Sequence, residues 1–137
     1  MHGSSTQALV ERLAKATNDH DLDALGECFA VDYLNETPVH PTRGFRGRDQ
    51  VRRNWEQIFA FVPDLTATVV VSAVEGDTAC TEWEMTGTRR DGTTHHMRGV
   101  IVFNVQDDVA QSARLYLEPV DTQPSTVDEA VRAQVAR

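Results

Sequence analysis

The sequence predicts an α+β fold in the order helix, helix, strand, helix, four strands and a short C-terminal helix. Apolar residues recur at helical spacing between residues 4 and 29 and again between residues 48 and 60. Residues 65 to 120 instead alternate between apolar and polar side chains and are interrupted by short turns, which is typical of a β-meander. At 137 residues we expect one domain, residues 1–137, with a core of about 6–122 and a tail of 123–137.

Amphipathic patterns and their boundaries predict three helices before the meander. The second follows a turn of Asn and Asp residues that can cap it, and its apolar stripe ends at Phe29. The third is the longest, with Trp55 and Phe59 on its apolar face, and it ends before Pro63. The three predicted helices cover residues 6 to 17, 22 to 29 and 48 to 60.

Runs rich in β-branched residues predict five strands. A loop with Pro38, Pro41 and two glycines separates the first strand from the third helix. In the tail, valines recur every fourth residue from Val127 to Val135 and predict a short helix. We expect this helix to pack on its own domain, with contact to a partner subunit as the alternative. The predicted strands cover residues 33 to 37, 65 to 74, 79 to 89, 95 to 105 and 110 to 120.

The composition argues against several classes of protein. Thirteen Lys and Arg against 21 Asp and Glu leave a net charge of −8, so no nucleic-acid partner is expected. No apolar run approaches the roughly 18 residues of a membrane span, so no membrane is expected either. The first residues lack a basic region followed by an apolar stretch, which predicts a cytoplasmic location. Cys28 and Cys80 are expected to be buried thiols.

Two pairs of polar residues could share a cavity, because residues two apart on a strand face the same side. Tyr33 and Asn35 could fix a substrate oxygen or a water; alternatively, they satisfy backbone groups. His96 could act as acid or base while Arg98 holds an enolate or carboxylate oxygen. The alternative is that His96 bonds a backbone carbonyl or lies at the rim, and that Arg98 pairs with an acid. The candidate acids are Glu36, Glu82 and Glu84.

No metal or cofactor is expected. His95 and His96 are adjacent and would point to opposite faces of a strand, so they cannot share one ion. There is no paired cysteine spacing, phosphate-binding loop or nucleophilic serine elbow. A basic stretch either attracts an anionic ligand or forms a solvated surface; it contains Arg43, Arg46, Arg48, Arg52 and Arg53.

Several short segments, in their order, resemble the SnoaL-like branch of the nuclear transport factor 2-like superfamily over about residues 6 to 122. They include residues 18–25 (NDHDLDAL), 29–32 (FAVD), 47–51 (GRDQV), 63–65 (PDL), 82–83 (EW), 98–100 (RGV) and 114–119 (RLYLEP). The resemblance implies a cone-shaped, curved mixed sheet wrapped around the N-terminal helices, enclosing one pocket for a small apolar molecule. It also implies a homodimer.

The superfamily includes enzymes whose catalytic groups can be placed on this sequence. A gap-free alignment puts the three groups of ketosteroid isomerase on Leu13, Val100 and Thr37, so steroid isomerisation is not expected. The Tyr-x-Asn pair of limonene epoxide hydrolase matches Tyr33 and Asn35. The positions of its Asp-Arg-Asp triad, however, fall on Met85, Trp83 and Leu115.

Strand alternation, phased by these alignments, gives the candidate site. Besides the candidates named below, we expect the side chains of Thr81 and Ala113 to face the pocket. Glu118 ends an Arg-x-Tyr-x-Glu run similar to the SnoaL-like pattern, and the cyclases of that branch use an aspartate as general acid and base. Strand alternation places Glu118 on the outer face, where it would form a cross-strand or subunit contact. A local bulge would turn it inward. The candidate catalytic residues are Tyr33, Asn35, His96, Arg98 and Glu118. The candidate substrate-binding residues are Thr37, His40, Trp55, Phe59, Trp83, Met85, Val100, Leu115 and Leu117.

The first functional hypothesis is therefore a cofactor-independent enzyme using general acid-base chemistry. It would cyclise, isomerise, dehydrate or hydrate a small hydrophobic substrate resembling a polyketide, terpenoid or steroid. The alternative is a non-catalytic ligand-binding or accessory protein of the same fold. A third hypothesis is a purely structural homodimer module whose interior is filled by side chains.

Overall fold

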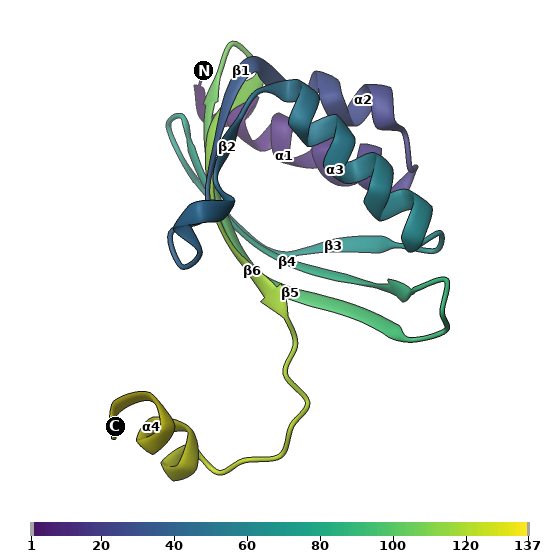
Figure 1. Ribbon diagram of the computed structural model, residues 1–137. Coiled ribbons are helices and arrows are strands. Elements are labelled where there is room, and N and C mark those ends of the chain that lie inside the picture. Colours follow the sequence, from purple (N-terminus) through teal and green to yellow (C-terminus); the bar gives the residue numbers. More distant parts are fainter. Residues whose placement is uncertain (1, 137) are drawn as a thin grey trace.

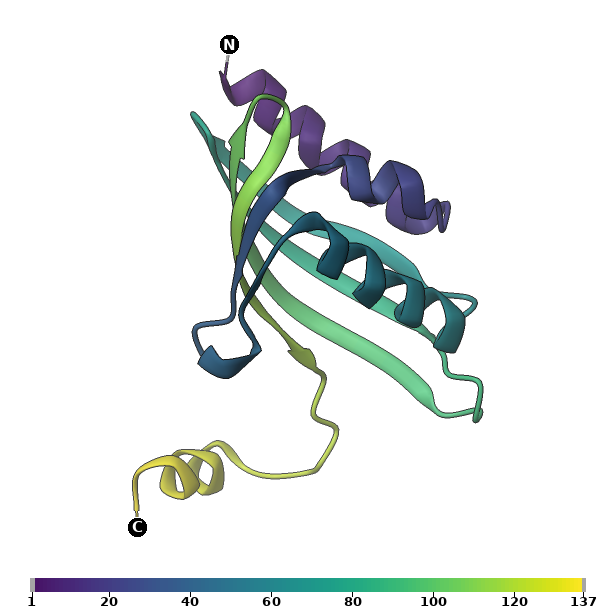
Figure 2. The same cartoon turned by 45° about the horizontal axis from the view of Figure 1, so that its top comes forward.

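The computed structural model describes residues 2–136 and confirms the predicted α+β class. Helices α1 (His2–Asn18) and α2 (Leu22–Glu27) come first, and α3 (Arg48–Phe61) follows the first strands. The Asp21 side chain accepts a hydrogen bond from the Ala24 N–H and caps α2, as its position before an apolar stripe predicts. All three helices lie over the same concave face of the sheet (Figures 1 and 2).

One curved six-stranded sheet forms the other layer, in the order β2-β1-β6-β5-β4-β3. The last four strands pair as an antiparallel meander, whereas β1 pairs in parallel with β6. The strand bounds are β1 (Phe29–Glu36), β2 (Phe45–Arg46), β3 (Thr66–Glu75), β4 (Thr78–Thr88), β5 (Thr94–Gln106) and β6 (Val109–Pro119). Because the sheet curls around the helices, its concave face and the helices enclose the core (Figure 1).

The core lies between that concave face and the apolar stripes of the helices. Leu9 and Leu13 of α1 are buried against the sheet, and Trp83 and Phe103 are buried on it. Burying large side chains of this kind contributes about 1.5–3 kcal/mol each. Leu13, Trp83 and Phe103 also line the pocket described below.

The two cysteines occupy different environments. Cys28 is buried at the end of α2, as expected. Cys80 is exposed, so the expectation that it is a buried thiol is wrong. Its neighbours in β4, Ala79 and Thr81, are buried, and strand alternation therefore turns Cys80 to the outer face of the sheet.

One helix boundary and two short elements differ from the sequence prediction. Phe29 was expected in the second helix, but Cys28 ends that helix and Phe29 begins β1, opposite Ala110 of β6. The 3₁₀ turn η1 (Pro41–Arg43) and the two-residue strand β2 were expected to be plain loop. Neither is long enough to show a hydrophobic period, so periodicity could not reveal them.

The C-terminal helix α4 (Val127–Val135) forms as predicted, with Thr126 accepting the Glu129 N–H at its start. It stands apart from the rest of the chain at the end of an extended segment (Figure 1). None of its residues is buried, and Val127, Val131 and Val135 are 79%, 52% and 73% exposed. The expectation that it packs on its own domain is therefore wrong: residues 120 to 126 form no regular structure and lead it away from the sheet.

Candidate functional site

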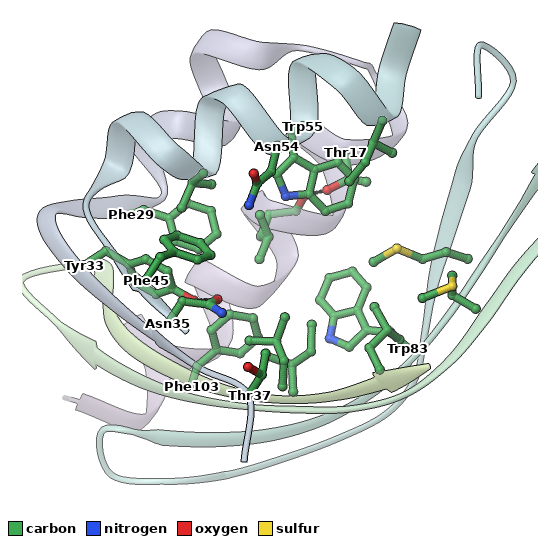
Figure 3. Close-up of a pocket in the computed structure, with 18 of the residues that line it drawn as sticks. Thr17, Phe29, Tyr33, Asn35, Thr37, Phe45, Asn54, Trp55, Trp83 and Phe103 are labelled. Carbon is green, nitrogen blue, oxygen red and sulfur yellow. Dashed lines mark hydrogen bonds between the residues drawn. The ribbon is translucent and has the colours of Figure 1, made fainter. Parts of the chain in front are cut away.

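A pocket of about 310 Å³ lies between the concave face of the sheet and helices α1 and α3 (Figure 3). A cavity of this size is at the lower end of the range for drug-sized ligands. The interior is therefore not filled by side chains, contrary to the hypothesis of a purely structural module. Its apolar lining consists of Leu13, Phe29, Phe45, Val51, Trp55, Ile58, Trp83, Met85, Met97, Ile101, Phe103, Leu115 and Leu117.

Tyr33 and Asn35 form a buried polar pair in the pocket wall (Figure 3). They lie two apart on β1, so both face inward, and the Tyr33 hydroxyl donates to Asn35 Oδ1 at 2.8 Å. Burial raises the pKa of the Tyr33 phenol, which therefore stays protonated and keeps this bond.

The hydrogen bond from Tyr33 uses the amide oxygen of Asn35 and does not involve its amide nitrogen, Nδ2. This nitrogen finds no partner among the described residues, yet every fully enclosed side-chain polar atom among them has one. Asn35 Nδ2 must therefore be open to the cavity. The pair offers a ligand one amide donor and the acceptor capacity of the Tyr33 oxygen, which suits a carbonyl or hydroxyl group.

Three other polar side chains in or behind the pocket wall are already engaged in hydrogen bonds. Trp83 Nε1 donates to Thr81 Oγ1 at 2.7 Å, and that hydroxyl donates to the Ile101 carbonyl oxygen at 2.7 Å. Thr17 likewise donates to the Leu13 carbonyl oxygen at 2.8 Å. Trp83 therefore presents only its ring to the cavity, as an apolar wall.

His95 also lines the pocket, half-buried at the start of β5. Burial, with a smaller contribution from the positive charge of Arg89, lowers the pKa of His95 below its usual 6.5, so the ring is neutral at neutral pH. No carboxylate lines the pocket. His95 is thus the lining side chain that can exchange a proton near neutrality.

His95 and Asn35 belong to opposite ends of the pocket. Asn35 is level with Ala113 of β6, and Ala113 is level with Phe103 of β5. From residue 103 to residue 95 the strand runs for eight positions, about 26 Å along the curved sheet. The two polar groups therefore start from well-separated positions on the sheet, and a ligand that contacts both must be elongated.

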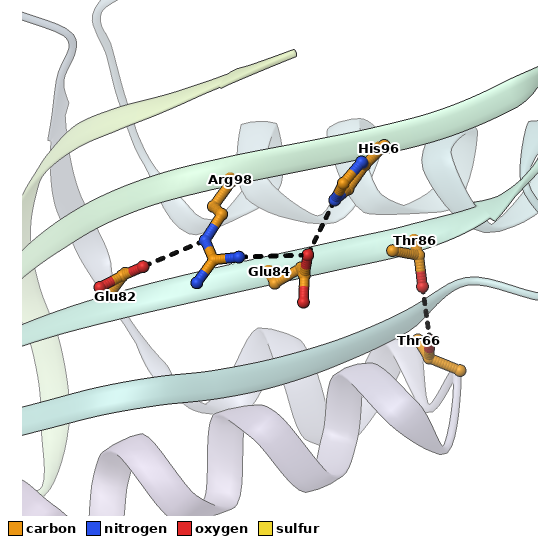
Figure 4. A network of polar contacts seen from close by, with 6 residues as sticks. All are labelled: Thr66, Glu82, Glu84, Thr86, His96 and Arg98. Atoms are coloured by element: carbon orange, nitrogen blue, oxygen red, sulfur yellow. Dashed lines mark hydrogen bonds and ion pairs between the residues drawn. The ribbon is translucent and has the colours of Figure 1, made fainter. Parts of the chain in front are cut away.

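The prediction that His96, Arg98 and Val100 face the pocket is wrong. In the register of β4 with β5, Trp83 lies opposite Gly99 and Met85 opposite Met97, so the odd-numbered residues of β5 share the inner face. His96 and Arg98 point from the outer face and pair with acids of β4 (Figure 4). The distances are 2.8 Å from His96 Nε2 to Glu84 Oε2 and 3.1 Å from Arg98 Nε to Glu82 Oε2.

The ion pairs of Arg98 match the alternative interpretation of that residue. Its guanidinium also lies 3.5 Å from Glu84, so Glu84 is shared between Arg98 and His96. Hydrogen bonding to His96 is the main cause that lowers the pKa of Glu84, and Arg98 contributes. These groups lie at the surface, where solvent screens such pairs and they contribute little to stability. They lie on the outer face of the sheet and cannot touch a ligand in the pocket.

Three other candidate residues lie outside the pocket lining. Glu118 faces outward, as strand alternation predicted, and its Oε1 lies 2.5 Å from His40 Nε2. That pair connects the loop after β1 to the end of β6. The Phe59 ring stacks on His20, with centroids 4.4 Å apart, and does not line the pocket. The expectations that Glu118, His40 and Phe59 contact a substrate are thus not supported by their positions.

The remaining candidates face the cavity as expected. They are Tyr33, Asn35, Thr37, Trp55, Trp83, Met85, Leu115 and Leu117. Sequence reasoning missed His95, Met97 and Asn54, and it named Arg43 only as one member of the basic stretch. A signal for the first two was present: Phe103 and Val105 alternate with Asn104 and Gln106, and the same alternation, continued toward the start of the strand, turns residues 97 and 95 inward.

Residues 2–136 contain neither a metal-binding cluster nor a membrane-spanning helix. No group of three or more His, Cys, Asp or Glu side chains in this range could hold a metal ion. No helix in this range is long and apolar enough to cross a membrane.

Comparison with known proteins agrees with the resemblance seen in the sequence. The model of the SnoaL-like domain matches residues 10–111. The chain belongs to the SnoaL-like domain family. No curated protein matches it by sequence.

Solved structures of SnoaL-like and related proteins share the fold of this family member. IdmH, a proposed polyketide cyclase of Streptomyces antibioticus, has 24% identity and a TM-score of 0.72, with 82% of this chain and 91% of that one covered. An epoxide hydrolase of Mycobacterium tuberculosis, similar to limonene epoxide hydrolase, has 16% identity and a TM-score of 0.73, with 86% of each chain covered. A second M. tuberculosis protein, solved with estradiol-17β-hemisuccinate, has 18% identity and a TM-score of 0.70, with 82% and 92% covered. At these identities the likeness is one of fold.

Proposed function

We propose that this SnoaL-like protein is a cofactor-independent enzyme that moves a proton on a small, elongated, largely apolar substrate. The observation that carries the proposal is an apolar pocket with a neutral histidine, His95, at one end and a free amide donor, Asn35, at the other. The reactions of this class are cyclisation, isomerisation, dehydration and hydration, each of which needs a proton to be removed or added.

Each end of the pocket has its own role. His95 takes a proton from the reacting part of the substrate and returns it to a neighbouring atom or to a leaving hydroxyl group. Asn35 Nδ2, oriented by the Tyr33 hydroxyl, donates to an oxygen remote from the reaction. Binding energy gained at such a remote group can hold the reacting atoms against His95. A polyketide-, terpenoid- or steroid-like compound has both the apolar body and the separated oxygens.

The second candidate function is ligand binding without turnover. It is favoured by the absence of any carboxylate from the pocket lining and by the outward position of His96, Arg98 and Glu118. Under this proposal the pocket stores, carries or presents the same kind of molecule.

Two adjacent histidines give the decisive experiment a matched control. His95→Gln removes the proton-transfer group inside the pocket, and His96→Gln removes its neighbour on the outer face. Both tryptophans of the chain, Trp55 and Trp83, line the pocket, so their fluorescence reports occupancy. Polyketide-, terpenoid- and steroid-like ketones and alcohols would be screened for fluorescence quenching and then, by chromatography, for conversion.

An enzyme should convert a bound compound, and His95→Gln should lower the rate about 100-fold or more while quenching persists. His96→Gln should retain the rate within about twofold. Quenching without conversion of any bound compound would support the binding protein. Equal losses in the two variants would overturn the assignment of His95.

We also propose that the chain acts as a homodimer in the cytoplasm. The three exposed valines of α4 form an apolar stripe that could be buried against a second copy. Cys28 and Cys80 are free thiols, which supports a reducing compartment. Light scattering should give a dimer mass for the natural chain and a monomer mass for Val131→Glu. A monomeric natural chain would refute the dimer, and cell fractionation tests the location.

A further inference from the structure

One basic side chain of the pocket has no partner among the residues that the structure describes. Arg43 closes the 3₁₀ turn η1, lines the cavity and is solvent-exposed, so it marks the rim of the pocket. No hydrogen bond or ion pair to another described residue occupies its guanidinium group. A planar group with five N–H donors is suited to bind a carboxylate through two parallel hydrogen bonds.

The neighbouring arginines are engaged elsewhere, and none of them lines the pocket. The basic stretch of the sequence is therefore divided by the fold: Arg43 faces the cavity, and the others stabilise the surface. Arg46 donates to the carbonyl oxygen of Asp32 at 3.2 Å, Arg48 to that of Phe29 at 2.9 and 2.7 Å, Arg52 to the Asp23 carboxylate at 2.7 Å and Arg53 to the Gln50 side chain at 2.7 Å.

The loop that carries Arg43 is held at several points. The Thr37 hydroxyl donates to the His40 carbonyl oxygen at 2.7 Å, and the Arg43 N–H donates to the same oxygen at 2.9 Å. The His40 ring is bonded to Glu118 of β6. Because the backbone is tied both to itself and to the sheet, the fold sets the place of Arg43 at the rim. This gives His40 and Glu118 a positioning role without contact to the ligand.

We propose that the natural ligand is an amphiphile whose apolar body fills the cavity and whose carboxylate pairs with Arg43. The inference rests on the proposed function, since it assumes that the pocket binds a small molecule. No acid lines the pocket, so a bound carboxylate would meet no like charge there. Asn35 lies opposite Phe45 in the pairing of β1 with β2, and Arg43 lies two residues before Phe45 in the chain. The acidic end of the ligand therefore lies toward Asn35, and the far end of its body lies toward His95.

A matched ligand pair tests this inference: estradiol, and estradiol-17β-hemisuccinate, which adds a terminal carboxylate. Dissociation constants would be measured by tryptophan fluorescence and by calorimetry at low and high salt. The proteins would be the natural chain, Arg43→Gln, Arg43→Lys and Arg46→Gln. The last variant removes a neighbouring arginine that does not line the pocket and serves as the control.

In the natural chain the hemisuccinate should bind about tenfold tighter than estradiol, because a charge-assisted hydrogen bond is gained at a partly exposed site. Arg43→Gln should abolish that preference and leave estradiol unchanged, and Arg43→Lys should keep part of it. High salt should weaken only the hemisuccinate. Arg46→Gln should behave like the natural chain.

Equal binding of the two ligands to the natural chain would overturn the role of Arg43 and leave the proposed function standing. The role of Arg43 would also be refuted if Arg46→Gln removes the preference as well as Arg43→Gln does, because the effect would then come from general surface charge. If neither ligand is bound by the natural chain, the proposed function fails, and this inference fails with it.

Discussion

Replacing Tyr33 by Phe removes one oxygen atom from the pocket wall and leaves the ring that packs on Phe29 in place. The lost hydroxyl is the donor to Asn35 Oδ1, and Asn35 is only 6% exposed. An acceptor left unpaired in such a place costs about 2 kcal/mol. For a chain of 137 residues, with about 2.1 cal/mol/K of unfolding entropy per residue, that lowers Tm by about 7 °C.

Urea unfolding followed by circular dichroism would measure the loss of unfolding free energy and test its cause. Asn35→Leu alone leaves the Tyr33 hydroxyl unpaired and should cost a similar amount. The double variant leaves neither group orphaned, so its loss should be smaller than the sum of the single losses by about 1 kcal/mol or more. An unchanged midpoint in Tyr33→Phe, or simple additivity in the double variant, would refute the coupled pair and the free amide inferred from it.

Three further predictions concern other parts of the molecule. A Cβ atom added at Gly99 would lie 2.0 Å from a backbone oxygen of β6, so Gly99→Ala should lower Tm by at least about 5 °C in a thermal melt; an unchanged Tm would contradict the close approach of β5 and β6. Cys80 is exposed, whereas burial raises the pKa of the Cys28 thiol, so one thiol per folded chain should react quickly with a disulfide reagent and the second only after unfolding; two fast thiols would contradict this. Because the pKa of His95 is lowered in the folded state, the unfolded chain binds more protons just below pH 6.5, and stability falls as the pH decreases there. Urea midpoints should therefore depend less on pH in His95→Gln than in His96→Gln. Equal slopes in the two variants would contradict the assignment.

The elements that the sequence predicted well are those with long periodic patterns. Helix α3 and strands β4 and β6 each repeat their pattern over more than ten residues, so their apolar faces were identifiable. The phase of β5 was inferred instead from a gap-free alignment to distant relatives, and this turned His96 and Arg98 inward. The alternation of Phe103 and Val105 with Asn104 and Gln106 within the strand itself indicated the true phase.

Other features depend on tertiary contacts that no local pattern records. Arg43 was one of five similar arginines, and only the path of η1 separates it from the rest. The valines of α4 predicted a helix but could not specify what it touches, because one apolar stripe fits its own domain or another chain equally well. The polar pair of β1, in contrast, could be predicted, because Tyr33 and Asn35 lie two apart on one strand and therefore face the same side.

The parallel pairing of β1 with β6 limits when the pocket can form during synthesis. Asn35 is held beside Ala113, so the wall that carries it is incomplete until almost the whole sheet has left the ribosome. The meander of β3 to β6 joins strands that are neighbours in sequence and can assemble early. Pairing of β1 with β6 closes the long stretch of chain between them, so it comes late and at a larger entropic cost. A nascent chain arrested before β6 should therefore bind no ligand, even with helices α1 to α3 already made.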